Sequence, residues 1–386
     1  MNEPHSNNNR YNALRLFAGE RKDMRMALVC NNASVTEAGI TTRADLIAND
    51  FNLVKLFSPE HGLNAAGEDG AWQNDGIDQL TGLSITSLYG NRLAPSAADL
   101  LDIDLVLFDI PDVGCRFYTY LWTMTYVMES CAANHVPLII LDRPNPIGGN
   151  LQLAEGPMLE EATCASFIGR WRIPVRHSCT LGELAFYFAA TKMTGLQLQV
   201  IPWQSWQRNN TSDIIFTPTS PAIQKQRTAL LYPGMGLLEG INVNEGRGTN
   251  TPFEIFGAPW INADVLQKAF TKEQQPGIIS TPISYRPMAG LYANETCHGL
   301  KITVTNEDEF RPVQMGIALI KTILQCYPAE AAERLYCTVA NPSGKGHLDK
   351  LLGIVDAFTK IKTGATIQNT VADEWEETMK NYLLYL

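Results

Sequence analysis

Apolar runs of strand length recur along the first half of the chain, and segments with helical spacing separate them. This alternation of strands and helices is typical of a parallel, right-handed, doubly wound sheet. We therefore expect a Rossmann-like α/β fold. The expected strands are Met24–Cys30, Val54–Phe57, Leu83–Tyr89, Leu105–Ile110, Val136–Leu141 and Leu196–Ile201, and the expected helices are Thr41–Asn49, Pro95–Leu101, Trp122–Asn134 and one that begins at Thr180.

The pattern changes beyond Trp206, where Pro, Ser, Thr and Asn become frequent, as is typical of a domain boundary. The remainder looks α+β, with a strand pair around Gly299–Thr305 and helices over Val313–Cys326 and from Asp373 to about Leu384. The expected parts are a polar N-terminal extension over 1–23, a Rossmann-like domain over 24–226 and a smaller α+β domain over 227–386.

The composition excludes several classes of protein. Thirty Lys and Arg against forty Asp and Glu give a formal net charge of −10, so we expect neither a nucleic-acid nor a membrane partner. The eight cysteines are scattered, without zinc-site spacing, which favours free thiols in a reducing compartment. The N-terminus lacks the apolar run of a signal peptide, so we expect a cytoplasmic protein, or a periplasmic or secreted one if a leader has been removed.

Polar residues follow four of the expected strands directly. The carboxyl ends of parallel strands share one edge of a sheet, where α/β proteins place their ligands. Glu60 in the turn Ser58–Gly62 is the leading catalytic candidate, although a helix cap at Glu60 and a surface turn at His61 remain an open alternative. The further strand-end candidates are Asn31, Asp109, Asp112, Arg116, Tyr118, Asp142 and Arg143.

The signatures of common cofactors and hydrolases are missing. No GxGxxG follows the first strand, and the chain has no Walker A loop, no GxSxG elbow and no HExxH. Asp109, Asp112 and Asp142 could hold Mg²⁺, but aspartates at strand ends often cap helices, so we expect no metal and no cofactor. Carboxylates, arginines and aromatic rings around a cleft suit a polyhydroxylated ligand instead. The segment Glu245–Thr249 adds a glutamate and Arg247 on a glycine-containing loop, or else it forms a tight turn closed by an ion pair.

Six blocks of sequence resemble the NamZ-type exo-β-N-acetylmuramidases and occur in that family's order, covering about residues 24–386. The blocks are SPEHG (58–62), FDIPDVGCRFYTY (108–120), LDRPNP (141–146), RHSCTLGELA (176–185), YPGMGLLEG (232–240) and EGRGTNTPFEIFGAPW (245–260). The sequence departs from the family pattern in two places: Pro111 stands where glutamine is usual, and Ser178-Cys179 replace the usual Gly-Met.

The resemblance implies a cleft between two domains and the release of N-acetylmuramic acid from non-reducing ends of peptidoglycan fragments. The partner would be a muropeptide or a peptidoglycan-derived saccharide, and the oligomeric state is left open. By motif match Glu60 would be the catalytic carboxylate. The pocket would be lined by Asn31, His61, Asp109, Asp112, Arg116, Tyr118, Asp142, Arg143, Glu239, Asn242, Glu245 and Arg247.

We expect Glu60 to act as a general acid whose pKa is raised by burial and by neighbouring carboxylates. Glu245 is the first candidate for the second catalytic group and Asp112 the next, while the substrate's own acetamide remains a third possibility. An arginine suits the lactyl carboxylate of the sugar, and the candidates for this contact are Arg116, Arg143 and Arg247. A non-catalytic muropeptide or amino-sugar binding protein, or a hydrolase of another amide or ester, is the alternative.

Overall fold

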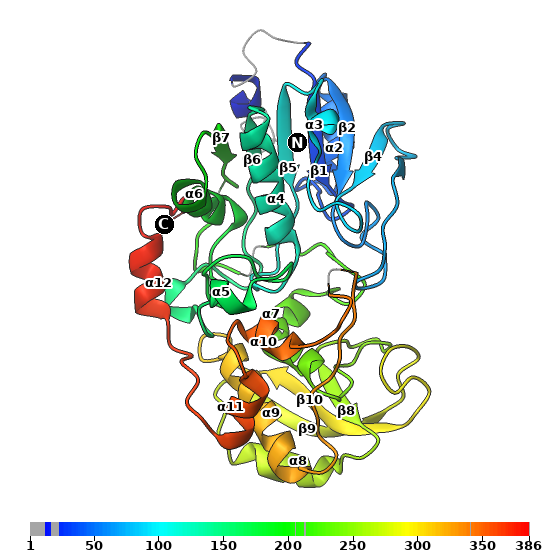
Figure 1. Ribbon diagram of the computed structural model, residues 1–386, viewed down its shortest axis with the longest axis vertical. Helices are drawn as coiled ribbons and strands as arrows, with labels where there is room; N and C mark the ends of the chain where they lie inside the picture. The colour runs from blue at the N-terminus through cyan, green and yellow to red at the C-terminus, as the bar shows by residue number, and fades with distance from the viewer. Residues whose placement is uncertain (1–11, 17–22, 205, 212–213, 340, 386) are drawn as a thin grey trace, which may run out of the picture.

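The computed structural model describes residues 12–16, 23–204, 206–211, 214–339 and 341–385. Most of the expected extension over 1–23 therefore lies outside the described residues. A seven-stranded sheet occupies the upper part of Figure 1, and a three-stranded sheet occupies the lower part.

The larger sheet has the strand order β3-β4-β2-β1-β5-β6-β7, and all of its pairs are parallel except β3 with β4. Setting β3 aside, this is the order of a doubly wound dinucleotide-binding sheet, with the switch point between β1 and β5. The Rossmann-like fold class is confirmed. The strands are β1 (Met26–Cys30), β2 (Leu53–Ser58), β3 (Gly76–Ile77), β4 (Ser84–Ser87), β5 (Leu105–Asp109), β6 (Leu138–Leu141) and β7 (Leu198–Ile201).

Two helices of the first half start at a residue whose side chain caps the helix end. The Thr180 hydroxyl accepts the Glu183 N–H while the Glu183 carboxylate accepts the Thr180 N–H, and Ser96 and Asp99 form the same capping box. Reciprocal bonds of this kind satisfy N–H groups that a helix end would leave unpaired. The helices are α2 (Thr42–Ala48), α3 (Ala97–Leu100), α4 (Tyr120–Ala133), α5 (Glu161–Cys164) and α6 (Leu181–Lys192), with a 3₁₀ turn η1 (Leu151–Leu153).

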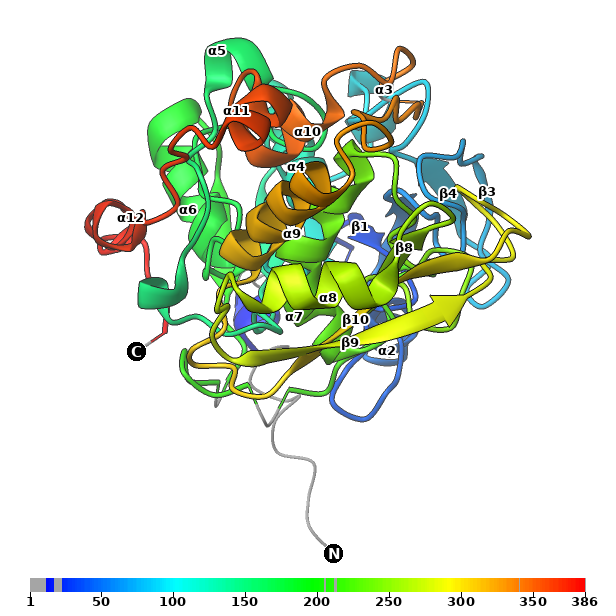
Figure 2. The same ribbon diagram turned by 90° about the horizontal axis from the view of Figure 1, so that it is seen from below.

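The second half is α+β, as expected, with α8 and α9 over the antiparallel sheet β8-β10-β9 (Figure 2). Its strands are β8 (Ile255–Ala258), β9 (Ile278–Tyr285) and β10 (Cys297–Val304). Its helices are α7 (Gln226–Met235), η2 (Gly236–Gly240), α8 (Ala263–Thr271), α9 (Pro312–Cys326), α10 (His347–Leu352), α11 (Ala357–Thr363) and α12 (Ala372–Met379).

Close packing explains why α7 has Gly234 in its last turn, beside Pro233. A Cβ on Gly234 would lie 2.0 Å from the Pro312 carbonyl oxygen, and one on Gly316 would lie 2.4 Å from the Gly234 carbonyl oxygen. Only glycine lets the two backbones approach so closely. The sequence did not predict α7, because these residues are helix breakers in isolation.

The end of the chain returns to the first half, where α12 lies beside α6 (Figure 1). The Trp375 indole donates to the His177 carbonyl oxygen at 2.7 Å, and the Tyr385 hydroxyl donates to Asp142 at 2.8 Å. The division at 226/227 stays a prediction, and this tail crosses it. The predicted final helix is also too long, since α12 ends at Met379.

All eight cysteines are free, and six of them are buried. Among the described residues, no helix combines the length and the hydropathy that crossing a membrane would need.

Candidate active site

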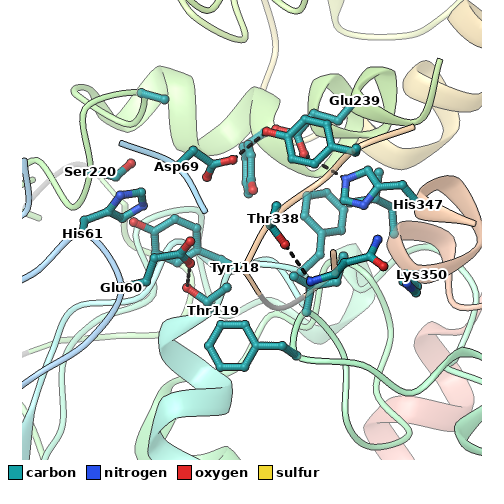
Figure 3. Close-up of a pocket in the computed structure, with 18 of the residues that line it drawn as sticks. Glu60, His61, Asp69, Tyr118, Thr119, Ser220, Glu239, Thr338, His347 and Lys350 are labelled. Atoms are coloured by element: carbon teal, nitrogen blue, oxygen red, sulfur yellow. Dashed lines mark hydrogen bonds and ion pairs between the residues drawn. The ribbon is translucent and has the colours of Figure 1, made fainter. Parts of the chain in front are cut away.

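A cavity lies between the two halves of the chain, and residues of both halves line it. The first half contributes the loops that follow β2 and β5, and the second half contributes η2, α10 and the loops around them. Figure 3 shows Glu60 and His61 on one side of this pocket and Glu239, His347 and Lys350 on the other. The cleft between domains that the resemblance implied is therefore present.

The Glu60 carboxylate lies directly beyond the end of β2 and is only 4% exposed. Its Oε1 accepts the Gly70 N–H at 2.9 Å, and its Oε2 accepts the Thr119 hydroxyl at 2.7 Å. Burial and the nearby Asp69 carboxylate raise its pKa, against the opposing effects of His61 and the two hydrogen bonds. A carboxyl group in this environment favours the protonated form that a general acid needs.

His61 holds the loop that presents Glu60. Its φ of 66° places it in the left-handed region, which histidine tolerates better than most residues. Its Nδ1 lies 2.8 Å from the Gly67 carbonyl oxygen, an acceptor, so Nδ1 donates to it. Gly62 follows with a φ of 70°, also in the left-handed region, where glycine is favoured.

Asp69 is a pocket carboxylate that the sequence analysis missed. The Tyr336 hydroxyl donates to it at 2.6 Å, and the Arg247 guanidinium lies 3.4 Å away. Partial desolvation would raise the pKa of Asp69, but Arg247, Tyr336 and nearby histidines together lower it. Neighbouring carboxyl groups thus have pKa values displaced in opposite directions, the pattern that separates an acid from a base or nucleophile.

Arg247 connects the pocket to a network of acids in the second half. It lies 2.8 Å from Glu239 and 3.2 Å from Glu245, and Arg334 approaches Glu245 at 3.3 Å. His347 contacts Glu239 at 3.4 Å on the other side (Figure 3). Glu245 is 1% exposed and does not line the pocket, so its assignment as the second catalytic group stays a prediction.

Glu60, His61 and Asp69 could together offer three ligand atoms to a metal ion. One such atom from each residue lies within 4.8 Å of the other two. Glu60 and Asp69 already accept hydrogen bonds from the protein, so a cation would compete with these donors. The expectation that no metal is required stays a prediction.

Five of the predicted site residues line the pocket, namely Glu60, His61, Tyr118, Glu239 and Arg247. Among them, Tyr118 is held in the pocket wall by a hydrogen bond, which its hydroxyl donates to the Thr219 hydroxyl at 2.7 Å.

Three further predicted residues bind the protein's own backbone or core and do not line the pocket, so their expected contact with a substrate stays a prediction. Arg116 is fully buried and donates to the carbonyl oxygens of Pro157, Ile173 and Leu351. Asp142, also fully buried, accepts the Gly182 N–H. Asn242 bonds the backbone at Glu330 and Ala332.

The other four predicted residues lie beyond the Tyr118 side of the pocket. Asn31 donates to the Tyr120 hydroxyl at 3.0 Å and does not line the pocket. Asp109 is fully buried and accepts two bonds from Arg143, at 2.5 and 2.9 Å. Asp112 and Arg143 line a second cavity, so neither lies in the pocket beside Glu60.

Two family models match the chain consecutively and almost completely. The N-terminal model of the exo-β-N-acetylmuramidase NamZ matches residues 26–227, and the C-terminal model matches residues 230–385. The chain belongs to the NamZ family. Peptidoglycan β-N-acetylmuramidase NamZ of Bacillus subtilis (strain 168) is 36% identical over 380 residues, which cover 96% of this chain and 89% of that protein.

Two crystal structures of DUF1343 family proteins from Bacteroides fragilis NCTC 9343 share the fold of this NamZ-family chain. The first has a TM-score of 0.85 and 27% identity, covering 98% of this chain and 97% of that one. The second has a TM-score of 0.70 and 26% identity, covering 94% of each chain. The likeness therefore extends over both halves and the pocket between them.

Proposed function

We propose that this NamZ-family protein is a glycoside hydrolase that acts on peptidoglycan fragments and releases N-acetylmuramic acid from their non-reducing ends. The observation that carries the proposal is the pair Glu60 and Asp69, whose pKa values are displaced in opposite directions within one pocket. Family membership supports the same conclusion, because the Bacillus subtilis relative is named as a peptidoglycan β-N-acetylmuramidase.

In this proposal Glu60 protonates the glycosidic oxygen as the bond to the leaving group breaks. Asp69 remains ionised and stabilises the positive charge that develops on the sugar, as nucleophile, as base for water or by orienting the substrate's acetamide. Asp69 thus takes the role that the sequence analysis gave to Glu245. The Thr119 and Gly70 hydrogen bonds fix the orientation of the Glu60 carboxyl group.

The pocket also offers a cation for the lactyl carboxylate. Arg247 is the one predicted arginine that lines the pocket, but three carboxylates already surround it. Lys350 lines the same pocket and forms no ion pair with any described residue. Lys350 is therefore the better candidate to bind a substrate carboxylate, and its ammonium donates one hydrogen bond within the described residues, to the Lys345 carbonyl oxygen at 3.3 Å.

A pair of chromogenic substrates tests the proposal. The purified protein should hydrolyse an aryl β-N-acetylmuramide much faster than the matched N-acetylglucosaminide, which differs only in lacking the lactyl group. Lys350→Met should narrow this preference about tenfold, mainly through a higher KM for the muramide. Equal rates in the unmodified protein, or no turnover of the muramide, would contradict the proposal.

Dialysis against a chelator tests the absence of a metal requirement. Activity should be unchanged after dialysis. A loss that Mg²⁺ or another divalent ion restores would instead assign Glu60, His61 and Asp69 to a metal site.

A further inference from the structure

A second cavity opens at the carboxyl ends of β1 and β5, where the strand order of the large sheet reverses. It shares no lining residue with the pocket that contains Glu60. Thr219 forms the wall between the two, because its hydroxyl accepts a bond from Tyr118 and its carbonyl oxygen accepts one from Tyr120, each at 2.7 Å. The cavity is thus a separate site, which the proposed hydrolysis does not use.

One side chain in this cavity has an unused acceptor. Asp112 is 4% exposed, and its Oδ2 accepts the Gly114 N–H at 2.9 Å and the His177 Nε2–H at 3.1 Å. The His177 Nδ1 accepts the Cys179 N–H, so this imidazole is neutral and donates from Nε2. The buried Oδ1 of Asp112 has no partner in the described part of the chain, a costly arrangement unless a ligand or water donates to it.

The charges of the cavity disfavour a phosphate or carboxylate ligand. Arg143 is the arginine on its wall, and Asp109 binds that guanidinium with both carboxylate oxygens. Asp112 and Glu37 both line the cavity, so carboxylates outnumber the one cation. Doubly wound sheets usually bind nucleotides at this position. The loop after β1, however, lacks the glycines that hold a pyrophosphate, so a nucleotide does not suit this cavity.

The remaining walls are apolar and partly aromatic. Trp203, Phe216 and Pro111 are half-buried at the cavity, and Trp203 packs against the Arg143 guanidinium at 5.5 Å. Flat apolar surfaces beside a vacant carboxylate acceptor match a ring that is apolar on its face and carries hydroxyl donors at its edge. We propose that this cavity binds a neutral sugar ring of the N-acetylglucosamine class, with a hydroxyl donating to Asp112 Oδ1.

Fluorine NMR of the full chain labelled with 5-fluorotryptophan tests this proposal. The chain has seven tryptophans, of which Trp203 and Trp206 line the second cavity and none lines the pocket. N-Acetylglucosamine should shift the Trp203 signal, assigned with Trp203→Phe, in a saturable way. N-Acetylmuramic acid should bind there at least several-fold more weakly, because its carboxylate would meet Asp112 and Glu37.

Two variants and one control locate the ligand. In Asp112→Asn, the Gly114 and His177 donors hold the amide oxygen, so the amide N–H₂ replaces the vacant acceptor, and the apparent Kd should rise at least about tenfold. Phe216→Ala should also weaken binding without touching the Asp112–His177 contact. Glu60→Gln should leave the Trp203 titration unchanged. The other tryptophan signals report that each variant is folded.

Three results would overturn the proposal: no Trp203 shift up to the solubility limit of N-acetylglucosamine, equal or tighter binding of N-acetylmuramic acid, or a titration that both variants leave unchanged. None of these results depends on hydrolysis, so this proposal and the proposed function can fail independently.

Discussion

Glu60 and Asp142 occupy equivalent places beyond the ends of two parallel strands, yet the structure gives them opposite surroundings. Glu60 follows β2 and faces the pocket between the two halves. Asp142 follows β6, and its carboxylate accepts hydrogen bonds from the Gly182 N–H and from the hydroxyl of Tyr385, which lies at the end of the chain. Burial raises the pKa of both, to about 6 for Asp142, so a raised pKa alone does not identify the catalytic group.

The difference between the two residues is access. A carboxyl group can transfer a proton only where a substrate can reach it, and Asp142 is fully buried. Replacing a carboxylate that takes part in catalysis should lower turnover, whereas replacing one that holds the fold should lower stability.

The largest effect is expected for Glu60→Gln, which keeps the shape of the side chain and removes the transferable proton. Turnover of an unactivated muramyl disaccharide should fall about 10²-fold or more, with the melting temperature nearly unchanged. Asp142→Asn is the matched control, and the folded fraction of that variant should keep its turnover. An equal loss of turnover in both variants would contradict the assignment of Glu60 to catalysis and of Asp142 to the fold.

Asp69→Asn should lower turnover by about 10²-fold, because the variant loses the charge that stabilises the positively charged transition state. Steady-state kinetics with the aryl muramide measures this effect, and Glu245→Gln is the comparison. If the Glu245 variant loses more turnover than the Asp69 variant while remaining folded, Glu245 and not Asp69 is the second catalytic group.

Asp109→Ala tests a carboxylate that the structure assigns to the fold. It would leave the Arg143 guanidinium without its buried partner, so the free energy of unfolding should fall by about 3 to 5 kcal/mol. Denaturant unfolding measures this loss. A stability close to that of the unmodified protein would show that the ion pair contributes little.

The smallest effect expected is a shift of the pH profile in Asp69→Asn. The Asp69 carboxylate raises the pKa of Glu60, and the proposed reaction needs Glu60 protonated. Without that charge Glu60 loses its proton at lower pH, so the alkaline limb of kcat/KM should move down by on the order of one pH unit. An unchanged or upward shift would mean that another group sets this limb.

Local patterns predicted six of the seven strands of the large sheet, because these are mainly apolar runs that end in turn residues, and Glu60 was selected through the same signal. The short strand β3 was missed, since it lies in a segment without a hydrophobic period. Asp69 gave no such signal, since it lies in a long aperiodic loop and gains its role from Tyr336, which is 267 positions away in the chain. Local patterns could not show that Arg116 and Asp142 lie outside the pocket lining, because the end of a strand predicts where a residue begins but not which later segment covers it. The covering segments, at Leu351 and Tyr385, come from the end of the chain.

The role of Glu60 as the acid is tested most directly by comparing leaving groups. The ratio of kcat/KM between the unmodified protein and Glu60→Gln should be measured on a series of muramides whose leaving groups differ in pKa. An acidic leaving group needs no proton, so the ratio should be large for the disaccharide and approach one for the most activated aryl group. A ratio that stays constant across the series would contradict the assignment of Glu60 as the general acid.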